Sequence, residues 1–212
     1  MTGCNCVPVR NQVRGNIRLS TVGTPQSTKL RYLVDAKGSR FTVRAYATGM
    51  LSAFGHNPTI AIPDVQGEVQ FASGTLEDAT LRIVIQAASL VVTDDISDND
   101  RQEIERRMHD EVLETDGFPE IIYECSRASS IQKMGEDLYL VALNGELALH
   151  GVTRNLPVSA RVTLKGDIVR AAGEFSIRQS DYEIRPVSAA GGTVKLKDEL
   201  KLSFDISARK QA

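Results

Sequence analysis

The chain has 212 residues, of which 42% are hydrophobic and 25% are charged, and its formal net charge is −2. This length allows one globular domain with a sizeable apolar core, and the near-neutral charge argues against nucleic acid as a partner. No segment approaches the roughly 18 apolar residues that a membrane-spanning helix needs.

The first 28 residues show no strong periodicity, so we expect a loosely ordered basic extension (1–28) followed by one domain over residues 29–212. No apolar segment follows the first basic residues, which predicts a cytoplasmic protein without a secretory signal; the periplasm is expected if a leader was removed. The three cysteines are Cys4, Cys6 and Cys125. An odd number forms a poor disulfide framework, and two thiols at Cys4 and Cys6 only weakly suggest a metal or redox site. We therefore expect no metal and no cofactor.

Apolar and polar residues alternate from about Leu30 onward. In residues 40–48, for example, Phe41, Val43 and Ala45 are separated by Arg or Thr. Such alternation is typical of antiparallel strands with one wet face. The same pattern recurs in residues 65–73, 79–87, 121–128, 137–151, 154–166, 168–178 and 199–208. We predict a mainly β protein, a closed lipocalin-like antiparallel barrel of about eight strands.

One segment breaks this pattern and predicts an amphipathic helix over residues 100–114. Ser97 followed by Asp100 resembles a capping box, and Gly117 and Pro119 would end the helix. Three apolar residues share one face, namely Ile104, Met108 and Val112. Opposite charges one turn apart support the other face, Glu103 with Arg107 and Arg106 with Asp110. A helix with so few apolar anchors must lie on something, so we expect it against the barrel wall or across one mouth as a lid.

A barrel of eight strands can be filled by side chains or can hold one small ligand. Several residues in the inward phase are small, namely Ala45, Ala47, Gly67, Gly145, Ala160, Ala171 and Gly173. They either leave volume for a ligand or mark bends, bulges and the seat of the helix. The sequence pattern alone leaves both alternatives open.

Charge is distributed unevenly along the chain. Residues 1–44 carry eight Lys or Arg and one Asp, whereas residues 94–116 carry ten Asp or Glu and three Arg. Two solvated faces are the favoured interpretation. The alternatives are contact of the basic segment with anionic lipid head groups, or contact with a partner or a second copy in a homodimer.

Four ordered segments of the chain resemble the YceI-like family of polyisoprenoid-binding proteins. They are residues 52–71 (SAFGHNPTIAIPDVQGEVQF), the acidic helix leading into GFPEIIYE, residues 145–158 (GELALHGVTRNLPV), and residues 175–206, which begin FSIRQSDYEIRP. The resemblance implies a lipocalin-like barrel with a long hydrophobic tunnel that takes up an isoprenoid or similar long-chain amphiphilic lipid without catalysis. Many members of the family are secreted to the periplasm.

The candidate site follows from this resemblance together with the inward phase of the strands. The predicted hydrophobic wall is Phe41, Val43, Phe71, Leu81, Ile83, Ile85, Tyr123, Leu147 and Phe175. The candidates for the mouth or the head group are His56, His150, Arg154, Arg178 and Arg185, and the candidate lid residues are Ile104, Met108 and Val112. Burial of each CH₂ contributes about 0.8 kcal/mol, so the apolar wall should set affinity and the polar mouth only orientation.

Simpler roles stand beside each polar candidate. The arginines fit surface ion pairs with Asp181 or Glu183, and each histidine fits a structural place beside a glycine turn. The chain contains neither GxSxG nor HExxH, so catalytic partners for the histidines are not evident. Two functional alternatives to a lipid carrier are therefore kept: a filled barrel that serves as a protein-interaction module, and an enzyme acting on a hydrophobic ligand in the same cavity.

Overall fold

The computed structural model describes residues 29–48, 57–73, 75–186, 188–189 and 194–211. Eight antiparallel strands form a barrel, each paired with the next, and the last pairs back with the first. In order around the barrel they are β1 (Lys29–Val34), β5 (Val65–Ala72), β6 (Thr80–Gln86), β8 (Glu120–Cys125), β10 (Leu138–Leu149), β11 (Val152–Lys165), β12 (Ile168–Arg178) and β15 (Glu199–Lys210). The predicted fold class is confirmed.

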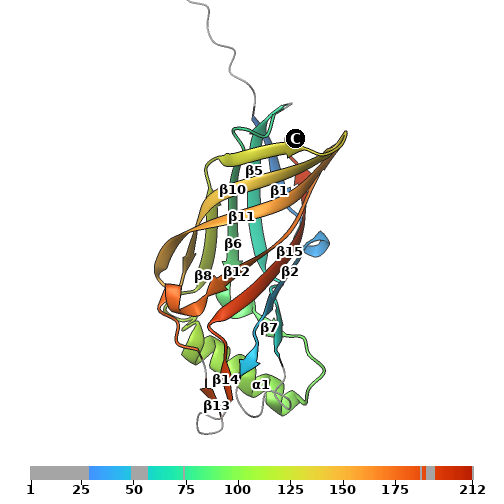
Figure 1. Ribbon diagram of the computed structural model, residues 1–212. Helices are drawn as coiled ribbons and strands as arrows, with labels where there is room; N and C mark the ends of the chain where they lie inside the picture. The colour runs from blue at the N-terminus through green and yellow to red at the C-terminus, as the bar shows by residue number, and fades with distance from the viewer. Residues whose placement is uncertain (1–28, 49–56, 74, 187, 190–193, 212) are drawn as a thin grey trace, which may run out of the picture.

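Short strands lengthen the barrel wall at one end (Figure 1). After β1 the chain turns through a 3₁₀ segment, η1 (Ala36–Gly38), where the Asp35 carboxylate accepts the Gly38 N–H at 3.2 Å. It then rejoins β15 as β2 (Arg40–Arg44), which is followed in the sheet by β4 (Thr59–Ala61) and β7 (Val91–Val92). The other short elements are η2 (Ala87–Ser89), β9 (Ala128–Lys133), which pairs with β10, and a small sheet of β3 (Ala47–Thr48), β13 (Ser188–Ala189) and β14 (Val194–Leu196).

The predicted helix lies across the lower end of the barrel in Figure 1. It comprises α1 (Asp98–Arg107) and a π-helical turn, η3 (Met108–Val112), in which the Leu113 N–H bonds the Met108 carbonyl at 2.9 Å. Ser97 caps it as expected, since its hydroxyl accepts the Asp100 N–H at 3.2 Å. The predicted pairs of opposite charge are present, Arg107 with Glu103 at 2.5 Å and Arg106 with Asp110 at 3.7 Å.

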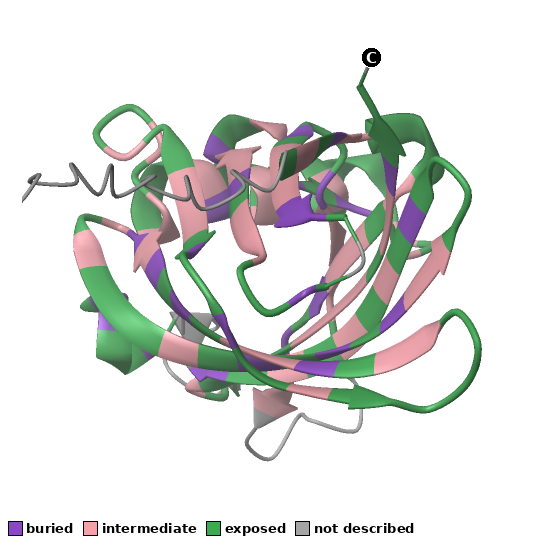
Figure 2. Ribbon diagram, turned by 90° about the horizontal axis from the view of Figure 1, so that it is seen from above, coloured by how far each residue is buried: buried purple, intermediate pink, exposed green. Residues whose placement is uncertain are grey.

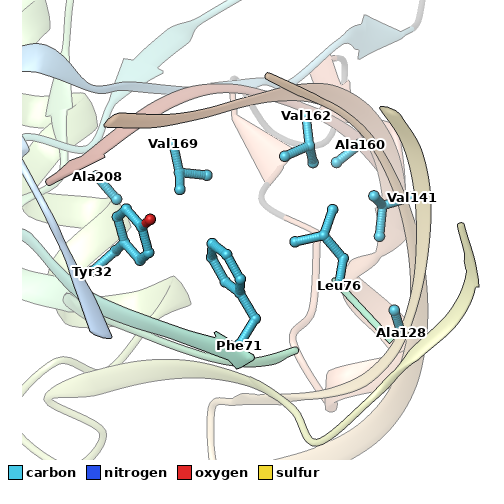
Figure 3. Close-up of a cluster of buried hydrophobic side chains, with 9 residues drawn as sticks. All are labelled: Tyr32, Phe71, Leu76, Ala128, Val141, Ala160, Val162, Val169 and Ala208. Carbon is cyan, nitrogen blue, oxygen red and sulfur yellow. The ribbon is translucent and has the colours of Figure 1, made fainter. Parts of the chain in front are cut away.

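The opposite end of the barrel is closed by a cluster of buried side chains that we call the upper cluster. Figure 3 shows its members projecting from several strands into the interior: Tyr32, Phe71, Leu76, Ala128, Val141, Ala160, Val162, Val169 and Ala208. Tyr32 and Phe71 stack with ring centroids 4.9 Å apart. In the view along the barrel, buried and exposed positions alternate along the strands, as the sequence pattern requires (Figure 2).

The small inward residues divide into two groups. Ala45, Ala47, Ala160 and Ala171 line the barrel cavity and leave volume there. The three glycines instead allow a close approach of neighbouring atoms. A Cβ at Gly67 would lie 2.5 Å from Ile83 Cδ1, and one at Gly145 would lie 2.5 Å from both the Tyr123 ring and the Glu124 carbonyl oxygen. A Cβ at Gly173 would lie 2.5 Å from the Ser159 carbonyl oxygen and 2.7 Å from the Phe204 ring. Both interpretations of the small residues therefore hold, each for a different residue type.

Candidate ligand-binding cavity

A cavity of about 690 Å³ runs inside the barrel from the upper cluster to the helix. Its lining comes from β2, β4, β5, β6, β8, β10, β11, β12 and β15, and most of the side chains are aliphatic or aromatic. An apolar enclosure of this volume is typical of small-molecule sites.

Every residue predicted for the hydrophobic wall lines this cavity, from Phe41 on β2 to Phe175 on β12. Ile83 is 5% exposed and Val43, Phe71 and Leu147 are also buried. Phe204 packs between two of the predicted rings, with centroids 6.4 Å from Phe41 and 6.2 Å from Phe175. That these side chains touch a ligand stays a prediction.

The hydroxyl of Tyr123 is a polar group in the middle of the cavity wall. Its ring lies over Gly145, where no Cβ intervenes, and its hydroxyl donates to the Leu156 carbonyl at 3.1 Å. Burial raises the pKa of the phenol to about 12, with a smaller contribution from Cys125. The phenol therefore stays neutral at physiological pH. Its hydroxyl is satisfied by the hydrogen bond to β11, and its ring forms part of the apolar wall.

The charged part of the lining is confined to the end with the helix. Asp94, Asp100, Glu103 and Arg107 border the cavity there. Arg107 is engaged with Glu103, and hydrogen bonds from Arg106 and Arg107 lower the pKa of the Glu103 carboxyl to about 2. This end is therefore acidic in character at neutral pH.

The candidate lid residues Ile104, Met108 and Val112 all line the cavity. The helix that carries them is attached to the edge of β7 by polar contacts. The Glu105 carboxylate accepts the Val92 N–H at 2.8 Å, while Arg101 donates to the Val92 carbonyl and to the Asp94 carbonyl, the latter at 2.8 Å. These bonds complete the hydrogen bonding of an exposed strand edge and fix the helix over the opening.

The four described mouth candidates, His150, Arg154, Arg178 and Arg185, do not all lie at one site. His56 and the segment around it, like Cys4, Cys6 and the extension 1–28, lie outside the described residues. His150 lies in the β10–β11 turn at φ 50°, with its ring centroid 4.4 Å from that of Phe118 and its Nε2 3.6 Å from Glu114 Oε1. It is not among the cavity residues, and its two buried ring nitrogens have no hydrogen-bond partner among the described residues.

Arg154 and Arg178 lie in a second hollow on the outside of the barrel, and Arg185 is exposed and borders neither space. The predicted ion pairs of these arginines with Asp181 or Glu183 are not formed; Arg154 Nε instead donates to the Asp181 main-chain carbonyl at 3.0 Å. The sequence pattern had not indicated Gln179, which is 3% exposed, lines the cavity and donates to the Lys197 carbonyl at 2.9 Å.

A family model, the YceI-like domain, matches residues 32–208, so the chain belongs to the YceI-like family. The fold is similar to that of BcnA from Burkholderia cenocepacia, at 16% identity and a TM-score of 0.61, covering 82% of this chain and 98% of that one. It is also similar to a polyisoprenoid-binding domain from Saccharophagus degradans implicated in plant cell wall breakdown, at 17% identity and a TM-score of 0.63, covering 86% and 99%. A YceI protein from Campylobacter jejuni matches at 16% identity with a TM-score of 0.55, over 74% and 88%. No curated protein sequence matches the chain.

Two observations concern membrane crossing and metal binding. Among the helices that the structure describes, none is long and apolar enough to cross a membrane. Within the same residues, no group of three or more His, Cys, Asp or Glu could hold a metal ion. Cys125, the described cysteine, is buried, and its thiol donates to the Arg127 carbonyl at 3.0 Å.

Proposed function

We propose that this protein binds a long-chain, isoprenoid-like amphiphile in the barrel cavity and stores or carries it without chemical change. The observation that carries the proposal is the 690 Å³ apolar cavity inside a closed barrel. The printed description of the Saccharophagus degradans domain as polyisoprenoid-binding, in a structure of the same fold, supports it.

The energetics favour an apolar chain as the occupant. A chain of about 20 carbons gains on the order of 10 kcal/mol from burial before the cost of ordering it is subtracted. Charged side chains in the lining gather near the helix, so an amphiphile can keep its chain along the wall and its polar group away from the upper cluster. A filled interaction module is disfavoured by the volume of this cavity.

Native mass spectrometry of the freshly purified protein, followed by solvent extraction, tests the proposal directly. We expect a co-purifying lipid at close to one per chain, or uptake of one C20 isoprenoid alcohol on incubation, with the ligand recovered unchanged. A mass that stays bare after incubation with isoprenoids and fatty acids would contradict lipid binding. Recovery of an altered ligand would favour the enzyme alternative.

Substitutions that place a charge in the cavity wall should abolish lipid binding, and a matched surface variant controls for effects on folding. Ile83→Asp places a carboxylate among apolar cavity residues, and Leu81→Glu does the same two residues earlier on β6. Leu140→Asp, at a residue that is 43% exposed on β10, is the matched control. Ala171→Phe narrows the cavity without charge in case the acidic variants fail to fold. We expect loss of lipid uptake in the cavity variants and full uptake in Leu140→Asp.

A further inference from the structure

The barrel wall is not hydrogen-bonded along its whole length between β11 and β12. Strands β10 and β11 pair from Leu138 with Thr163 to Leu149 with Val152, and β12 pairs with β15 along its entire length. In contrast, β11 and β12 pair only between residues 161–165 and 168–172. Beyond Arg161 and Ala172 the ladder between β11 and β12 ends, although the Ser159 carbonyl still lies close to Gly173. We call the unpaired stretch between residues 154–158 and 174–178 the seam.

Local features of β11 fit an unpaired edge. Pro157 has no N–H to donate to a neighbouring strand. The Leu156 carbonyl accepts the Tyr123 hydroxyl, a side chain that reaches it from β8. At the lower end of the seam, Arg154 bonds the main-chain carbonyl of Asp181 in the 3₁₀ turn η4 (Gln179–Tyr182). The seam is thus bounded by ladder bonds above and by one side-chain bond below.

A groove of about 490 Å³ lies over this seam on the outer surface. Its lining residues are Arg154, Asn155, Leu156, Ser176, Ile177, Arg178, Asp181, Tyr182 and Glu199. Two of them, Leu156 and Ile177, also line the internal cavity. Groove and cavity are therefore separated by one layer of apolar residues, without a hydrogen-bonded ladder between them.

The groove differs in charge from the end of the cavity near the helix. Neither Arg154 nor Arg178 forms an ion pair within 4 Å with another described residue. Asp181 and Glu199 also border the groove, and Arg178 contributes, after the hydrogen bonds from Ser180, to the lowered pKa of the nearby Asp198 carboxyl. At the helix end, three carboxylates accompany Arg107, which is already engaged with Glu103. An anionic group is therefore better received by the two available guanidinium groups over the seam.

We propose that this groove seats the anionic head group of the amphiphile, a phosphate monoester or diphosphate, while the chain passes between Leu156 and Ile177 into the cavity. This inference rests on the proposed function, because the groove alone offers no place for the chain. Arg154 and Arg178 would hold the phosphate oxygens, and the Tyr182 phenol borders the same groove.

Two probes with the same chain distinguish the contribution of the head group to binding from that of the chain. Binding of geranylgeranyl monophosphate and of geranylgeraniol would be measured for the wild type and for Arg154→Gln/Arg178→Gln. We expect the double variant to weaken the phosphate at least tenfold, since each charge-assisted hydrogen bond is worth about tenfold or more. Affinity for the alcohol should stay within twofold. The single variant Arg178→Gln avoids the bond to Asp181 and should show a smaller loss in the same direction.

Arg161→Gln/Arg170→Gln is the control, because it removes one exposed arginine from each of the same strands where they are paired. Ser176→Trp, which fills the groove from β12, should also weaken the phosphate selectively. Equal phosphate binding in wild type and Arg154→Gln/Arg178→Gln, or equal losses in the control pair, would overturn the head-group site while alcohol uptake still upheld the proposed function. Failure of the wild type to bind either probe would instead contradict the proposed function.

Discussion

The two ends of the barrel are closed in physically different ways. The upper cluster closes one end with buried apolar side chains, including the stacked rings of Tyr32 and Phe71. The helix covers the other end, where it is attached through Arg101 and Glu105 to the β7 edge and surrounded by carboxylates. Apolar packing resists opening, because opening would expose apolar surface to water. Polar hydrogen bonds can instead be exchanged for hydrogen bonds to water. Folding stability should therefore depend on the first end and ligand exchange on the second.

The largest difference between the ends should appear on truncation of an apolar side chain. Phe71→Ala removes a ring that is 4% exposed and should lower the free energy of unfolding by about 3 kcal/mol. Ile104→Ala, on the helix, should cost only about 1 kcal/mol because that side chain is partly exposed beside the cavity. Urea unfolding followed by circular dichroism measures both. Similar losses in the two variants would contradict the division between the ends.

The polar attachment of the helix offers the next contrast. Arg101→Ala/Glu105→Ala removes the bonds to Val92 and Asp94 and should cost about 2 kcal/mol locally. Hydrogen exchange of the α1 amides should accelerate while the amides of β12 and β15 keep their protection. Lipid dissociation should become faster as well.

Gln102→Ala, an exposed neighbour on the same helix, is the control for this attachment. If the double variant accelerates exchange of the barrel amides equally, the helix is part of the folding core and does not act as a lid.

The buried phenol of Tyr123 should make the free energy of unfolding fall at alkaline pH. The folded-state pKa of Tyr123 is about 12, above the ordinary value near 10, because the phenol is buried. Below pH 10 both states keep the proton and the contribution is complete; between pH 10 and 12 the unfolded state ionises first, so stability falls as pH rises. Allowing for partial exposure, the loss should be about 1.5 kcal/mol.

Unfolding at pH 8 and pH 11 checks this dependence in the wild type and in Tyr123→Phe. The variant should be slightly less stable at pH 8, because the bond to Leu156 is lost, and should fall less on going to pH 11. Burial also raises the pKa values of Tyr32 and Tyr182, so part of the alkaline loss should remain. An unchanged alkaline loss in Tyr123→Phe would contradict the assignment.

Much of the wall could be predicted from the sequence, because strand alternation is local and fixes which residues face inward. Phe41, Ile83 and Phe175 follow directly from period-two alternation. The seam between β11 and β12 could not be predicted, since it depends on which strands pair and for how long. The same limit applies to Gly145, whose missing side chain has meaning only once Tyr123 is known to lie over it.

The helix shows where local signals suffice and where they stop. Ser97 and the charge pairs specified its start and its exposed face, but the π turn from Met108 to Val112 has no sequence signature. Arg154 was a candidate for the head group, yet its neighbour across the seam, Asp181, was expected to pair through its carboxylate; the main-chain carbonyl accepts the bond instead. Such details depend on tertiary placement.

The smallest expected effect is at the N-cap of the helix, and it tests whether the helix end of the barrel opens during ligand exchange. Ser97→Ala removes the acceptor for the Asp100 N–H and should destabilise the start of α1 by about 1 kcal/mol. Ser97 does not line the cavity, so equilibrium affinity for a C20 isoprenoid should change little, while dissociation and association both become faster if helix opening limits exchange. Stopped-flow displacement measures these rates, and Ser97→Thr should restore them because it keeps the hydroxyl. Unchanged rates, with the seam variants altering exchange instead, would place the route of the chain between β11 and β12.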